Sequence, residues 1–169
     1  MDVRFPIGQL QVPQTITQDH LDAWSQDIEE YTKRLQHTVE NIKDNQLQST
    51  YRPGAWTVQQ LVHHIADSQL NMYQRLKLAL TDANPEIPPF DQNQWVLMED
   101  YDLPIDISIQ LLEALNQRIV AVIKDIDLAQ LDRTFKLKDE GTVTVGETIA
   151  KLSWHENHHL AHINIALNQ

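Results

Sequence analysis

The stretch "ANPEIPPFDQNQWVLMEDYDLPID", residues 83–106, separates two segments in which apolar residues recur with the period of an α-helix. Its four prolines, at positions 85, 88, 89 and 104, exclude a continuous helix through it. Connections this long are uncommon between the helices of a bundle, and they are usually either functional or required by the topology. The arrangement of the helices on either side therefore has to account for this segment.

Helical periodicity covers most of the chain outside this stretch. The predicted helices run from about Thr17 to Lys43, from Thr57 to about Thr81, from about Ile107 to Ile126, and from Thr144 almost to Gln169. The second and the fourth open on "TVQQ" and "TVGE", which have the spacing of a capping box. Before the fourth, "TFKLKDEGTVTV" alternates apolar and polar residues around a glycine and predicts a short hairpin. These features predict an all-α four-helix bundle.

Length, charge and composition narrow the class of protein. A chain of 169 residues is expected to form a single domain, residues 1–169, with residues 1–16 as a strap on its surface. A net charge of -11 opposes binding to nucleic acid. The chain has no cysteine, so it offers no thiolate ligand or cysteine nucleophile. We find no apolar run of membrane-spanning length and no signal-peptide pattern, and we therefore expect a cytoplasmic protein that does not bind membranes.

Six of the eight histidines lie in two short segments, "LVHHIADS" (residues 61–68) and "HENHHLAHI" (residues 155–163). In the second segment, His155 with His159 and His158 with His162 are both spaced four apart, so either pair could present two imidazoles to one metal ion. A zinc ion used for catalysis takes three protein ligands, and the first segment offers the third. The apolar stripe of the fourth helix continues into His155 and His159, but spacing alone does not choose between the pairs.

The two histidine segments can meet only in one topology. The first lies near the start of the second helix and the second near the end of the fourth, so these helices must be antiparallel. In an up-down-up-down bundle they would be parallel, and the two segments would lie about 35 Å apart at opposite ends. Residues 83–106 are long enough to let the third helix run parallel to the second. We therefore predict an up-down-down-up topology with a long crossover between the second and third helices.

Residues 51–80 ("YRPGAWTVQQLVHHIADSQLNMYQRLKLAL") and 154–163 ("WHENHHLAHI"), together with "FPIG" at residues 5–8, resemble the YfiT-type branch of the DinB-like family of bacterial metal-binding bundles. The resemblance implies a divalent metal, zinc or nickel, held by His64, His158 and His162. It makes His63, His155 and His159 neighbours that hydrogen-bond the ligands or line a pocket, which differs from the preference of the apolar stripe for His155 and His159.

The resemblance also implies an enzyme. Members of the wider family transfer bacillithiol or mycothiol to small electrophiles, and others are described as metal-dependent hydrolases. A metal ion lowers the pKa of either a thiol or a water, so its chemistry suits both reactions. We favour a metal-dependent S-transferase that conjugates bacillithiol to an electrophilic small molecule, with hydrolysis as the alternative. A structural, storage or stress-related binding role is a third hypothesis, and it predicts a fourth protein ligand.

Three further side chains are weaker candidates for catalysis. Glu156 could act as a general base. Tyr73 and Arg75 lie beyond His64 on the second helix, and Arg75 could bind a carboxylate of the thiol cofactor through its two-pronged guanidinium. The ordinary alternative for each of these two is an ion pair with acidic neighbours on a helix face. We also expect a homodimer, in which an apolar helix face packs against a second copy.

Overall fold

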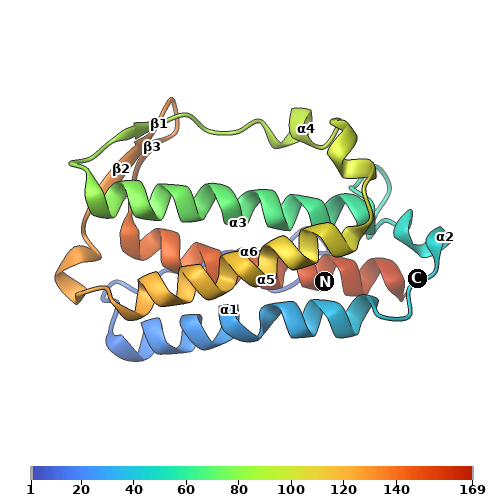
Figure 1. The fold of residues 1–169 in the computed structure, drawn as a ribbon, viewed down its shortest axis with the longest axis horizontal. Helices are drawn as coiled ribbons and strands as arrows, with labels where there is room; N and C mark the ends of the chain where they lie inside the picture. Colours follow the sequence, from blue (N-terminus) through green and yellow to red (C-terminus); the bar gives the residue numbers. More distant parts are fainter. Residues whose placement is uncertain (1, 169) are drawn as a thin grey trace.

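Four long helices form the body of the protein in the computed structural model, which describes residues 2–168. They are α1 (Gln18–Val39), α3 (Val58–Thr81), α5 (Ile105–Lys124) and α6 (Val145–Leu167). Helices α1 and α3 each pack against both α5 and α6. In Figure 1, α1 and α6 run in one direction and α3 and α5 in the other. The predicted four-helix bundle and its up-down-down-up topology are therefore confirmed.

The helices begin where the sequence supplies caps. The Thr57 side chain accepts a hydrogen bond from the Gln60 backbone N–H, and the Gln60 side chain accepts one from Thr57. Thr144 and Glu147 make the same reciprocal pair at the start of α6. Each box satisfies two backbone donors that a helix start leaves without a partner. Both predicted capping boxes are confirmed, and the observed helix ends lie within a few residues of the predicted ones.

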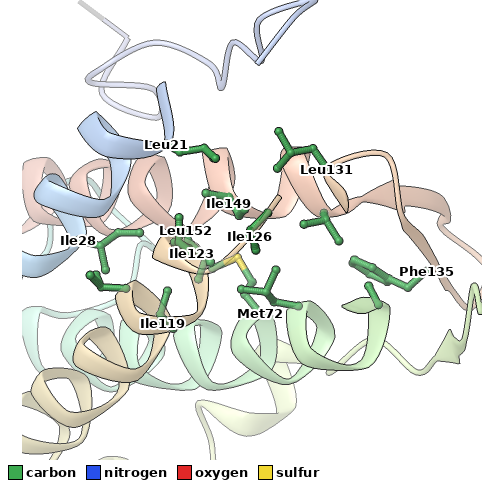
Figure 2. Close-up of a cluster of buried hydrophobic side chains, with 14 of the residues drawn as sticks. Leu21, Ile28, Met72, Ile119, Ile123, Ile126, Leu131, Phe135, Ile149 and Leu152 are labelled. Carbon is green, nitrogen blue, oxygen red and sulfur yellow. The ribbon is translucent and has the colours of Figure 1, made fainter. Parts of the chain in front are cut away.

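Two hydrophobic clusters fill the bundle, one toward each end. One joins the start of α1, the end of α3, the end of α5 and the start of α6 with the hairpin (Figure 2). The other joins the end of α1, the start of α3, the start of α5 and the end of α6. Between them, the buried side chains are polar: Ser68, Gln69, Asn116, His155 and Glu156. The bundle thus has a polar middle layer between two apolar halves.

The hairpin closes one end of the bundle. Strands β2 (Thr134–Leu137) and β3 (Gly141–Thr144) pair antiparallel, which confirms the predicted hairpin. Asp139 and Gly141 adopt φ of 66° and 113° in its turn, and glycine adopts such positive φ angles without steric cost. The crossover adds a strand that we did not predict, β1 (Glu86–Ile87), which pairs parallel with β2. Two residues between prolines are too few to show a strand period.

The rest of the crossover lies along α3 (Figure 1) and contains two short helices, α4 (Gln92–Trp95) and η1 (Glu99–Asp102). The Tyr101 hydroxyl donates to Asp67 at 2.6 Å. The His63 Nε2 lies 2.9 Å from the carbonyl oxygen of Leu103, and its Nδ1 lies 2.7 Å from the Ser108 hydroxyl. A carbonyl only accepts, so Nε2 carries the proton and Nδ1 accepts from Ser108. His63 therefore anchors the crossover to α3.

The remaining short helices are α2 (Asp44–Leu47), between α1 and α3, and η2 (Leu128–Gln130), between α5 and the hairpin. Within residues 2–168, no helix combines the length and the apolar character needed to cross a membrane.

Replacing His63 with alanine should lower the free energy of unfolding by about 1–3 kcal/mol, because Leu103 and Ser108 would each lose a buried hydrogen-bond partner. Chemical denaturation of the two proteins measures the difference. Gln59→Ala is the control, since Gln59 also bonds the crossover but is less buried. A loss at His63 no larger than that at Gln59 would show that the crossover is held by other contacts.

Candidate metal centre

Three histidines from two helices converge in the polar layer. His64 comes from α3, and His155 and His159 come from successive turns of α6; one ring nitrogen from each lies within 4.8 Å of the others. The Nε2 atoms of His64 and His155 are 3.2 Å apart. Two imidazoles that share a tetrahedral zinc ion place their nitrogens about 3.3 Å apart, given Zn–N bonds of about 2.0–2.1 Å. The observed separation therefore fits a shared divalent metal.

A second group of three consists of His158, His159 and His162, all from α6. The three ligands that the resemblance implies are divided between the groups, His64 in the first and the other two in the second. His155 and His159 continue the buried stripe of α6 toward α3. The ring of His158 instead stacks on Trp154 at 4.4 Å between centroids, and that of His162 stacks on Tyr51 at 3.9 Å.

A chain of hydrogen bonds orients His159. The His162 Nε2 lies 3.0 Å from the carbonyl oxygen of Val3, so it is the protonated nitrogen of a neutral ring. The other ring nitrogen of His162 then accepts, and it lies 3.3 Å from the Nδ1 of His159. His159 therefore donates from Nδ1 and keeps the lone pair of Nε2. Supporting hydrogen bonds of this kind fix the tautomer of metal-binding histidines in known sites.

Burial keeps these imidazoles uncharged. It lowers the pKa of His64 to about 4 and the pKa values of His155 and His159 well below the ordinary value, with repulsion between the rings as a further cause for the last two. Metal ligation requires the neutral ring. The Nδ1 atoms of His64 and His155 are buried without a hydrogen-bond partner. Leaving these polar atoms unpaired costs stability.

Glu156 lies behind the histidines in the bundle interior. It is fully buried, and its Oε1 accepts a hydrogen bond of 2.8 Å from Asn116, while its Oε2 has no partner. Burial raises the pKa of its carboxyl well above the ordinary value. Glu156 does not line either pocket beside the histidines. Glu156 is therefore a buried neutral group of the polar layer. It does not contact a substrate bound in those pockets.

The other two candidates for catalysis, Tyr73 and Arg75, lie in different surroundings. The Tyr73 hydroxyl accepts a hydrogen bond from Arg118 at 3.1 Å, and its partner is thus a basic residue of α5 rather than an acidic neighbour. Arg75 is buried and lines a pocket together with His155 and His159. We did not single out Lys151, which lines the same pocket. Its position in the sequence, one helical turn before His155, could have indicated that it lies on the same face of the helix.

Two pockets adjoin the histidines, and His158 and His159 line both. The α3–α6 pocket has a volume of about 270 Å³, and His155, Arg75 and Phe90 are among its lining residues. The strap pocket has a volume of about 460 Å³ and lies against Phe5 and Arg52. His155 and His159 of the first group therefore line a cavity large enough for a small molecule, whereas His64 is buried behind them.

Comparisons with known proteins agree with this architecture. The model of the DinB superfamily matches residues 27–163. A protein from Oceanobacillus iheyensis named "Putative metal-dependent hydrolase" is 54% identical over 168 residues, which cover 99% of this chain and 97% of that protein. One of the same name from Halalkalibacterium halodurans is 41% identical over 99% of this chain and 98% of its own length. This chain belongs to the DinB superfamily.

Among solved structures, the chain is similar to YfiT from Bacillus subtilis, described as "a probable metal-dependent hydrolase with an unusual four-helix bundle topology". The TM-score is 0.92 at 36% sequence identity, and the match covers 97% of this chain and 95% of that one. The resemblance seen in the sequence is confirmed at the level of family and fold.

The lowered pKa of His64 predicts an acid-sensitive metal-free protein. With a folded pKa of about 4, below the ordinary 6.5, the folded state binds fewer protons between these values than the unfolded state. The free energy of unfolding should therefore be highest above pH 6.5 and fall by about 3 kcal/mol toward pH 4 through His64 alone. Denaturation of chelator-treated protein across this range measures it, and His64→Gln should show a smaller fall. Equal falls in both proteins would contradict the prediction.

The raised pKa of Glu156 predicts the opposite dependence. The unfolded state ionises this carboxyl at a lower pH than the folded state does, so its contribution to stability declines as pH rises above about 4.5. Glu156→Gln removes this decline and should increase the free energy of unfolding at pH 8 by about 1 kcal/mol or more. Glu113→Gln, on the exposed face of α5, is the control. A less stable Glu156→Gln protein at pH 8 would indicate a charged, functional carboxylate.

Proposed function

We propose that this protein is a metal-dependent hydrolase in which His64, His155 and His159 hold a divalent cation, zinc or nickel. The observation that carries the proposal is the convergence of these three neutral imidazoles beside the α3–α6 pocket. Within residues 2–168, no fourth histidine, cysteine, aspartate or glutamate joins the group. Three protein ligands are typical of catalytic zinc, whereas structural zinc takes four. The names of the relatives support hydrolysis.

Bound there, a divalent cation supplies Lewis acidity, which lowers the pKa of a water or thiol and polarises a carbonyl group. The residues of the chain have distinct tasks around it. His162 keeps the Nε2 of His159 available. The Ser68 hydroxyl, 3.4 Å from the Nε2 of His64, provides a polar contact beside the ligands. Phe90, whose ring centroid is 6.5 Å from that of His64, lets the crossover limit access of water from one side.

A second candidate function is transfer of bacillithiol to an electrophilic small molecule. Two pockets on either side of His158 and His159 would suit a reaction of two substrates, one in each pocket. A chain without cysteine needs a thiol from outside for this chemistry. Arg75, which lines the α3–α6 pocket, would bind a carboxylate of such a thiol. The cytoplasmic location and the homodimer stay predictions.

Alanine variants distinguish the two ligand sets. His155→Ala or His159→Ala should reduce zinc affinity by more than about 100-fold, since each removes a ligand, and His162→Ala by roughly 10- to 100-fold, since it removes a supporting hydrogen bond. His158→Ala should change the affinity little. Competition with a chromogenic chelator on protein without a histidine tag provides the affinities. If His158→Ala loses the metal and His155→Ala keeps it, the set His64, His158 and His162 is correct.

Activity tests separate the two reactions. With one metal per chain, hydrolysis of a chromogenic ester should be abolished by a chelator and restored by zinc or nickel. The same preparation is assayed for conjugation of bacillithiol with a reactive haloalkane. Metal-dependent conjugation without ester hydrolysis would establish the transferase in place of the hydrolase. Metal binding with neither activity would favour the non-catalytic role.

A further inference from the structure

Arg75 is a buried cation without a counterion. Its side chain is only 8% exposed, yet it makes no hydrogen bond or ion pair with any residue in the described part of the chain. A charged side chain removed from water costs free energy unless an opposite charge or hydrogen-bond acceptors replace the water. The guanidinium carries five N–H donors, and these donors lie beside the α3–α6 pocket. Water or a ligand in the pocket therefore has to accept from them.

Lys151 is a second cation at this pocket. It lines the pocket from α6 and has no ion pair or hydrogen bond among residues 2–168, although, unlike Arg75, it is exposed to solvent. Partial desolvation and the nearby charge of Arg75 both lower the pKa of its ammonium. Two cations that repel one another at one pocket would both be stabilised by an anion between them.

The pocket contains no compensating acid. None of its lining residues is an aspartate or a glutamate, although the chain carries a net charge of -11. The acidic residue that acts on both cations is Glu140 in the hairpin turn, which lies outside the pocket lining and forms no ion pair with either. A positive pocket in an acidic protein selects anions locally rather than through the overall charge.

The other residues that line the pocket indicate what the rest of the ligand is like. Met72, Phe90 and Trp154 provide apolar surface, and His155 and His159 lie in the same cavity as the two cations. A volume of about 270 Å³ admits a small organic molecule. We propose that Arg75 and Lys151 form an anion subsite, which binds the carboxylate or phosphate group of a small substrate whose apolar body lies against these walls. That the bound molecule is the substrate rests on the proposed function, whereas the subsite itself does not.

Benzoate and benzamide form a matched pair of probes, because they share size and shape and differ in charge. Isothermal titration should detect benzoate binding and little binding of benzamide. Arg75→Met should weaken benzoate binding by about 10-fold or more, the loss expected for hydrogen bonds between charged groups. Lys151→Met should weaken it less. Arg118→Met, which alters an arginine outside both histidine pockets, should leave it unchanged. Inorganic phosphate in place of benzoate identifies which anionic group is preferred.

Metal-free protein separates the subsite from the metal centre. Benzoate binding that persists after chelation and depends on Arg75 supports the subsite even if hydrolysis is never found. Benzoate binding that needs the metal and is the same in Arg75→Met would place the anion on the metal and overturn the subsite. Equal binding of benzamide would also overturn it. Arg75→Lys keeps the charge, and so tests the proposal even if the methionine variant fails to fold; it should retain part of the affinity.

Discussion

The antiparallel packing of α3 on α6 is the constraint on which the rest of the structure depends. It places His64, in the second turn of α3, level with His155 and His159, in the middle and second half of α6. A short loop between α3 and α5 would have made α3 and α6 parallel and shifted these residues about 6 to 12 Å apart along the bundle axis. The long crossover is therefore the covalent device that allows the histidines to meet, and His63 and Tyr101 hold its end against α3.

The polar middle layer carries a cost that two apolar halves must offset. Neutral histidines, a neutral carboxyl and several amides occupy the centre of a small bundle, and some of their atoms lack partners. Such groups lower stability relative to an apolar core. A ligand that binds only the folded state returns part of that loss through mass action. On this view the metal contributes to the stability of the bundle as well as to its chemistry.

Much of the architecture could be predicted from the sequence, because it depends on local signals. The capping boxes of Thr57 and Thr144 set helix starts, and the length of residues 83–106 together with two histidine segments indicated the topology. The strand β1 could not be predicted, since its pairing with β2 is a long-range contact of two residues. The apolar stripe of α6 pointed to His155 and His159 but could not choose between His63 and His64 on α3, because these two flank its core face. The set His64, His158 and His162, which the resemblance implies, stays a prediction.

The hydrogen bond between Val3 and His162 joins residues at opposite ends of the chain. It has a consequence for synthesis on the ribosome, where the chain emerges from its N-terminus. Helices α1 and α3 appear first, yet both pack against α6, which emerges after them. The strap likewise has to wait for its partner on α6. The bundle can therefore close only after α6 has left the ribosome, and the site can take up a metal ion only from that point on.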